Sequence, residues 1–71
     1  MTSDTAAVVV DARGMRCPWP ALRLARAMRE AAEVRLLADD PQAGPEVAAL
    51  AAEHGWQIGD DAAGGWIVRR D

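Results

Sequence analysis

The order of hydrophobic and polar residues along the chain predicts short strands that alternate with helices. Three consecutive valines predict a first strand at 7–11, which ends before Gly14. From Pro18 to about Ala32, alanine, leucine and methionine recur at helical spacing, with arginines on the opposite side. This segment is therefore expected to be an amphipathic helix with a basic exposed face. The next apolar run predicts a strand at 33–38.

The segment after the second strand contains conflicting helix signals. Asp40, followed by a proline, has the pattern of a helix N-cap and favours a short turn at 40–43. Gly44 precedes Pro45, and a residue before proline is pushed away from the helical region. The main second helix is therefore expected only from residue 45 to 54.

The C-terminal part of the chain predicts a hairpin. Gly55 is placed as the C-cap of the second helix, and alternating segments follow at 56–60 and 65–69. The whole chain, 1–71, is expected to be a single domain with an ordered core at about 7–70. The order βαβαββ predicts an α/β (α+β) two-layer sandwich, with a mixed four-stranded sheet and both helices on one face.

Composition narrows the classes of function. The 71 residues carry a net charge of −3, with a pI near 4.9, so no direct binding of nucleic acid is expected. One cysteine and one histidine are too few for a zinc site, and a single cysteine forms no internal disulfide. The N-terminus lacks the features of a secretory signal, and no apolar run approaches the roughly 20 residues of a membrane span. We expect a soluble cytoplasmic protein.

The only cysteine lies in an unusual stretch, GMRCPWP. If Cys17 is the N-cap of the first helix, Pro18 is at N1 and Pro20 at N3, where a missing amide hydrogen breaks no helical bond. The amides of Trp19 and Ala21 are then free donors near the sulfur, at the positive end of the helix dipole. This arrangement favours a reactive cysteine at the surface.

The local charge favours the same interpretation. Arg13 and Arg16 flank Cys17, and the segment from Asp11 to Glu30 contains five arginines and two acids. The rest of the chain has three arginines and nine acids. A basic patch around a thiol favours its thiolate form and attracts acidic partners. The alternative is that Cys17 is a small buried hydrophobic residue.

The sequence DARGMRCPWP, which contains Gly14, Cys17, Pro18 and Pro20, resembles the signature of the TusA/SirA-type sulfur-carrier proteins, with its Cys-Pro-x-Pro motif. LADDP and EHGW resemble later landmarks of that family in the same order. The resemblance covers about 8–69. It implies the fold that is also found in the C-terminal domain of bacterial translation initiation factor three.

The resemblance implies a sulfurtransferase function for Cys17. A donor, either a cysteine desulfurase or a rhodanese-like enzyme, would load it as a persulfide, with no other cofactor and no metal. An acceptor sulfur-relay protein would then remove the sulfur for tRNA thiolation, molybdenum cofactor synthesis or sulfur oxidation. Gly14 would allow a tight turn, and Asp11 would anchor the loop through backbone amides. Whether the chain counts as an enzyme in its own right stays open.

A partner surface is expected beside the thiol. Leu22, Arg23 and Arg26 lie on the exposed side of the first helix, and Trp19 is either a docking anchor or a core residue. His54 is assigned no catalytic role. The chain is expected to be a monomer or a weak dimer.

Two other functions compete with sulfur transfer. One is a non-catalytic protein-binding or regulatory module that uses the basic face of the first helix. The other is a redox sensor that forms a disulfide between two copies of Cys17.

Overall fold

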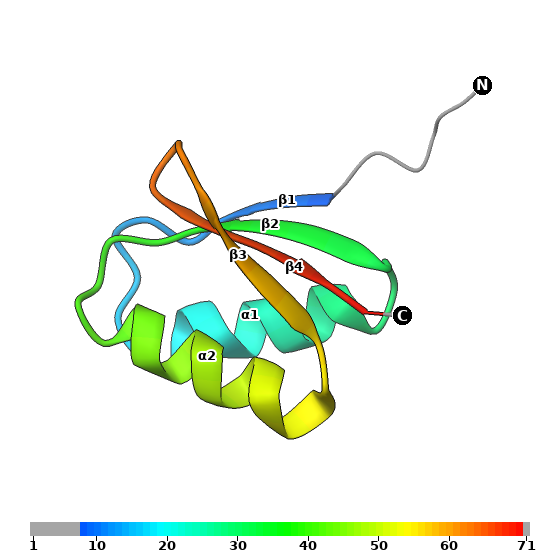
Figure 1. The fold of residues 1–71 in the computed structure, drawn as a ribbon. Coiled ribbons are helices and arrows are strands. Elements are labelled where there is room, and N and C mark those ends of the chain that lie inside the picture. Colours follow the sequence, from blue (N-terminus) through cyan, green and yellow to red (C-terminus); the bar gives the residue numbers. More distant parts are fainter. Residues whose placement is uncertain (1–7, 71) are drawn as a thin grey trace.

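The structure is a computed structural model in which residues 8–70 are described. Its elements confirm the predicted order (Figure 1). They are β1 (Val8–Asp11), α1 (Trp19–Met28), β2 (Glu33–Leu37), α2 (Ala43–His54), β3 (Gln57–Asp61) and β4 (Gly65–Arg69). Ala7, predicted as the first residue of the first strand, lies outside the described residues.

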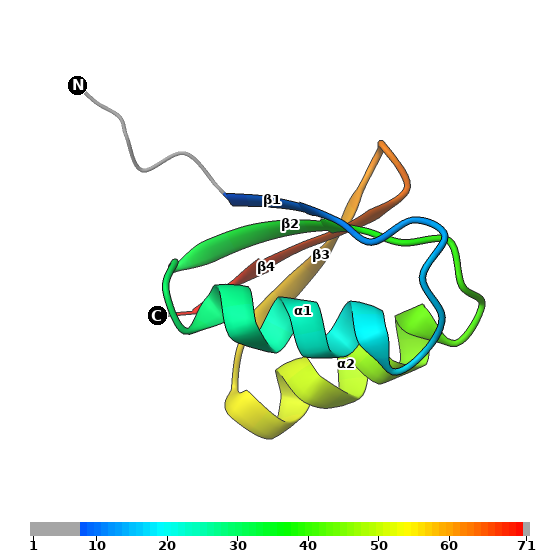
Figure 2. The same cartoon turned by 180° about the vertical axis from the view of Figure 1, so that it is seen from behind.

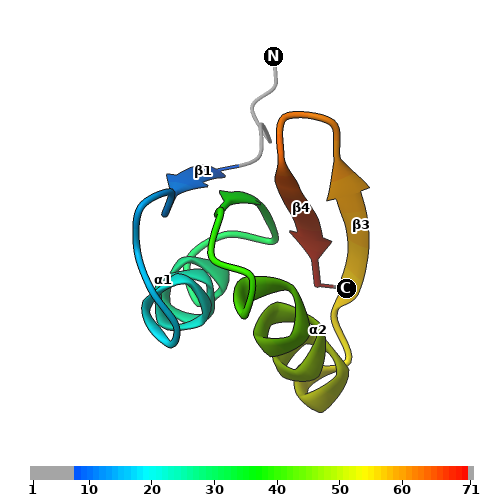
Figure 3. The ribbon, with the colours of Figure 1, turned by 90° about the vertical axis from the view of Figure 1, so that its left-hand side faces the viewer.

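The sheet is mixed and has the order β1-β2-β4-β3. β1 pairs with β2 in parallel, and β4 pairs antiparallel with both β2 and β3. Both helices lie against the same face of the sheet, which the end-on view in Figure 3 shows most clearly. The two-layer sandwich predicted from the sequence is confirmed.

The core lies between the helices and the covered face of the sheet. Alternate residues of β1, β2 and β4 point into it, as the period of two requires. Three residues of α1 and three of α2 meet them from the other layer. The fully or nearly buried set is Val10, Ala12, Pro20, Leu24, Met28, Val34, Leu36, Ala43, Val47, Ala51 and Val68. Trp56 and Trp66 are half-buried and pack against its edge.

The first helix is shorter than predicted. It ends at Met28 rather than near Ala32, and Arg29 and Glu30 form a turn. The carbonyl of Ala32 accepts a hydrogen bond from the Arg70 amide at 2.9 Å. The carbonyl of Ala32 is therefore bonded to the end of the sheet and not to a following helical turn, and β2 begins at the next residue.

The second helix begins earlier than predicted, at Ala43 rather than Pro45, with Gln42 as its N-cap. The expected interruption at Gly44 was wrong for two reasons. Glycine has no Cβ to clash with the following proline ring, and an amide in the first helical turn has no intrahelical partner to lose. The C-cap was predicted correctly, since Gly55 is left-handed with φ of 73°.

A matched pair of leucines on α1 tests the layer arrangement. Leu24 is fully buried and Leu22 is 52% exposed. We expect Leu24→Ala to lower the free energy of unfolding by about 2–5 kcal/mol, because it removes core contacts and leaves a cavity. Leu22→Ala is expected to change it by less than about 0.5 kcal/mol. Urea denaturation followed by tryptophan fluorescence measures both, and equal losses would contradict the assignment of the buried face.

Candidate functional site

The candidate site forms where two loops meet at one end of the sheet. β1 and β2 are parallel, so both strands deliver their following loops to the same edge. Figures 1 and 2 show these loops, 12–18 and 38–42, side by side from opposite directions. The pairing continues past the strands, because the Ala12 amide donates to the Leu37 carbonyl at 2.7 Å. The loop that carries Cys17 therefore lies against the loop that leads into α2.

Two consecutive aspartates hold the loops together. Asp39 Oδ1 accepts a hydrogen bond from the Gly14 amide at 2.9 Å. Asp40 Oδ2 accepts one from the Cys17 amide at 2.6 Å, and its Oδ1 accepts one from the Gln42 amide at 2.9 Å. The Gln42 and Cys17 amides lower the pKa of Asp40. The pair of acids was interpreted from the sequence only as a turn signal, so its contact with the cysteine loop was missed.

The turn before Cys17 has the geometry predicted for it. Gly14 has a φ of 84°, in the left-handed region that favours glycine, and the Met15 amide donates to the Ala12 carbonyl at 3.1 Å. Asp11 does anchor the loop, since its Oδ1 accepts from the Arg13 amide at 3.1 Å. The Arg13 guanidinium also binds that carboxylate at 2.8 Å, and the pKa of Asp11 falls to about 2 through these hydrogen bonds.

The start of the first helix differs from the prediction. Cys17 is not the N-cap; that position is taken by Pro18, after a cis Cys17–Pro18 peptide bond. Pro20 is therefore at N2 and is buried. The Trp19 amide is not a free donor toward the sulfur, because it donates to the Arg16 carbonyl at 2.9 Å. The helix begins one residue later than predicted, so Cys17 lies just before the capping position.

The electrostatic environment of Cys17 is the opposite of the one predicted. The pKa of its thiol is raised, first by partial burial, then by the negative charge of Glu46 and a hydrogen bond with it, and last by the charge of Asp40. Arg13 pairs with Asp11 instead of facing the sulfur. Arg16 lies close enough to Asp40 to lower the pKa of that carboxyl. The predicted stabilisation of the thiolate by arginines was therefore wrong.

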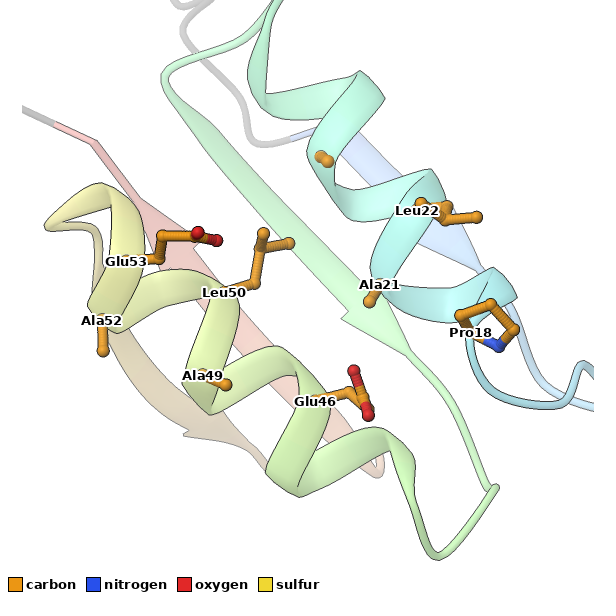
Figure 4. Close-up of a pocket in the computed structure, with 9 residues that line it drawn as sticks. Pro18, Ala21, Leu22, Glu46, Ala49, Leu50, Ala52 and Glu53 are labelled. Atoms are coloured by element: carbon orange, nitrogen blue, oxygen red, sulfur yellow. The ribbon is translucent and has the colours of Figure 1, made fainter.

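Two open depressions adjoin the cysteine. The first has a volume of about 480 Å³ and is lined by Gly14, Met15, Arg16, Cys17, Asp39, Asp40, Pro41 and Gln42. The second is a groove of about 660 Å³ between α1 and α2, which begins at Pro18 beside Cys17 (Figure 4). The small side chains of Ala21, Ala25 and Ala49 help to keep this groove open. Cys17 itself is half-buried, so the sulfur is neither in the core nor fully exposed.

The residues predicted to contact partners do lie on the surface next to the cysteine. Trp19 is 60% exposed and Leu22 is 52% exposed, so Trp19 does not fold back on the core. Arg26 is exposed on the next turn of α1. Arg23 is exposed as well, and its guanidinium donates to the Asp11 carbonyl at 3.3 Å. Exposed apolar side chains next to arginines are typical of protein interfaces.

The other candidate chemistry lies away from this site. His54, in the last turn of α2, stacks on Trp56 with ring centroids 4.4 Å apart. Within residues 8–70, no group of three or more potential ligands is arranged to hold a metal ion. In the same range, no helix has both the length and the apolar character to cross a bilayer.

Comparison with known proteins identifies the family. The family model for sulfurtransferase TusA matches residues 8–69. The chain belongs to the TusA sulfurtransferase family. Proteins of this family are sulfur carriers that work in sulfur relay with other proteins, and the family assigned from the sequence is confirmed. A search of curated proteins gave no match.

The aspartate pair gives a prediction with a built-in control. Asp40→Ala removes the acceptors of the Cys17 and Gln42 amides, so amide hydrogen exchange at both positions is expected to accelerate. Asp39→Ala removes the acceptor of the Gly14 amide and is expected to accelerate exchange there. Exchange measured by NMR should therefore be faster at Cys17 and Gln42 only in Asp40→Ala, and faster at Gly14 only in Asp39→Ala. Acceleration spread equally over all three amides in both variants would contradict separate roles for the two carboxylates.

Proposed function

We propose that the chain carries sulfane sulfur as a persulfide on Cys17. Membership of the TusA family supports this function, and the placement of Cys17 supports the residue. Cys17 is the only cysteine of the chain, and its half-buried side chain borders an open depression beside α1. With no second cysteine, the chain has no internal thiol that could displace the sulfur from Cys17.

Loading begins with the Cys17 thiolate, formed by loss of the thiol proton. The thiolate attacks the outer sulfur of a persulfide on a donor protein, such as a cysteine desulfurase or a rhodanese-like enzyme. A sulfur–sulfur bond forms to Cys17 and the donor's sulfur–sulfur bond breaks, with its electron pair left on the donor sulfur. The donor thiolate takes up the proton, so the exchange needs no oxidant or reductant.

Unloading repeats the same exchange in the other direction. A thiolate of an acceptor sulfur-relay protein attacks the outer sulfur of the Cys17 persulfide, and Cys17 returns to its thiol form. The acceptor would serve tRNA thiolation, molybdenum cofactor synthesis or sulfur oxidation. Because a free thiol must persist between cycles, we place the protein in the reducing environment of the cytoplasm.

The first two turns of α1 supply the surface that we assign to partner binding. Trp19 and Leu22 offer exposed apolar area next to the cysteine, and Arg23 and Arg26 supply positive charge. Partners with an acidic rim around their reactive cysteine match this surface.

The residues around the cysteine act on the shape of its loop. Asp11, Arg13 and Gly14 hold the turn before it, and the prolines on either side of Trp19 fix the first turn of α1. Arg16 is exposed at the rim of the depression. We propose that these residues position the Cys17 loop. None of them cancels the negative charge of Glu46 and Asp40, which disfavours the thiolate.

The exposed apolar and basic surface of α1 also favours a second candidate function. A non-catalytic binding module would use Trp19 and Leu22 in the same way, with Cys17 as a bystander. The two functions differ in their dependence on the thiol. Cys17→Ser abolishes sulfur transfer and spares simple binding.

Intact-mass spectrometry tests the proposal. The reduced protein is incubated with a cysteine desulfurase and cysteine, and in parallel with polysulfide. We expect a mass gain of one sulfur atom per chain that reductant reverses, because the thiol near the surface can reach a persulfide. Cys17→Ser is expected to gain nothing.

An alkylating reagent provides the control for access to the thiol. If the reduced protein gains no sulfur from either source while the reagent still labels Cys17, the carrier function is wrong. The binding module would then be the better account.

A further inference from the structure

Three carboxylates from two different segments lie near the loop that carries Cys17. Asp39 and Asp40 come from the loop after β2, and each already accepts a hydrogen bond from a backbone amide of the cysteine loop. Glu46 comes from the first turn of α2. None of the ion pairs found in residues 8–70 involves Glu46, and its negative charge lies near enough to raise the pKa of the Cys17 thiol. Glu46 is therefore the acid that acts on the sulfur itself.

The position of Glu46 follows from the packing of the two helices. Glu46 and Pro18 line the same end of the groove between α1 and α2. In Figure 4 the Glu46 side chain extends from α2 across the groove toward the first turn of α1, where Pro18 and Ala21 lie. Glu53 lines the far end of the groove, two turns along the same helix. The chain thus has two glutamates that line one groove from the same helix, of which only Glu46 lies at the end next to Cys17.

We propose that Glu46 retains the carried sulfur, because its carboxylate lies across the groove from Pro18, the residue next to Cys17, and its negative charge makes Cys17 a poor leaving group. This inference rests on the proposed function, since it concerns release of sulfur from a Cys17 persulfide. When a nucleophile takes the outer sulfur, negative charge develops on the inner sulfur of Cys17. A fixed carboxylate next to that atom opposes the charge.

The raised pKa of the Cys17 thiol agrees with this role. A thiol with a higher pKa leaves more slowly in thiol–disulfide exchange. Small cellular thiols would therefore remove the sulfur slowly from the free carrier. A cationic group brought to Glu46 by an acceptor protein would cancel the carboxylate charge and speed release at the docked complex. Arg16 is the cation on the cysteine side of the site, and it faces Asp40.

Cyanide is a suitable probe of release. Cyanide attacks the outer sulfur of the Cys17 persulfide and forms a carbon–sulfur bond, and the sulfur–sulfur bond breaks with its electron pair on Cys17. The products are thiocyanate and Cys17 thiolate, which takes up the persulfide proton. Cyanide itself is the two-electron reductant, so the step needs no other oxidant or reductant, and thiocyanate is measured directly.

The experiment compares full-length variants that are loaded with polysulfide and checked for one added sulfur by mass. Glu46→Gln removes the charge but keeps the shape, and we expect it to release thiocyanate about threefold or more faster than the unmodified chain. Glu46→Lys, which places a cation at the same position, is expected to be faster still. Glu53→Gln makes the same charge change away from the sulfur and is expected to match the unmodified chain.

A second readout separates charge from altered access. The rate at which iodoacetamide alkylates the unloaded Cys17, followed against pH, should have its midpoint at lower pH in Glu46→Gln and an unchanged plateau at high pH, because the charge alters ionisation and not access. Failure of every protein to load would overturn the proposed function itself. Normal loading with equal release rates in Glu46→Gln and the unmodified chain would overturn only the role of Glu46. Equal acceleration by Glu53→Gln would overturn it as well, since a general charge effect would then suffice.

Discussion

The parallel pairing of β1 with β2 is the constraint on which the site depends. It sends the loop that contains Cys17 and the loop that leads into α2 off the same edge of the sheet. The covered face of the sheet then fixes both helices side by side, with their first turns beside the cysteine. Asp40 joins the two loops through the Cys17 and Gln42 amides. The position of the sulfur is thus a consequence of strand topology, and the aspartates adjust it locally.

Periodicity within short segments predicted most of the fold. Three valines, an amphipathic run and two alternating segments each depend on neighbouring residues, and each formed the expected element. The helix ends were less predictable. The start of α2 depends on the absence of a Cβ at Gly44, and the end of α1 depends on a hydrogen bond between Ala32 and Arg70. That hydrogen bond joins residues far apart in the chain, so neighbouring residues do not indicate it.

The charge around Cys17 could not be predicted from neighbouring residues. Arg13 is four residues from Cys17, but its charge is used by Asp11. Asp40 and Glu46, which do face the sulfur, are more than 20 positions away and arrive only through the fold. A count of arginines along the chain therefore gave the wrong sign for the shift in the pKa of the thiol. The motif led to Cys17, the residue that we propose as reactive, because a motif identifies a residue and requires no distances.

These charges fit a protein that must hold sulfur between two partners. A thiol with a low pKa would accept sulfur readily and lose it as readily to any small nucleophile. Carboxylates beside Cys17 oppose ionisation in the free protein, and docking can change that balance because the site is open on the side of α1. In the proposed function, the partner therefore takes part in setting the reactivity of the cysteine.

The pKa of Cys17 in the free protein is the quantity that tests this account most directly. It can be measured by following the 13Cβ chemical shift of Cys17 in the labelled, reduced chain as the pH is raised. We predict a single transition whose midpoint lies above that of an ordinary cysteine thiol, since partial burial, Glu46 and Asp40 all disfavour the thiolate. A midpoint below the ordinary value would contradict the account and would show that the arginines control the sulfur after all.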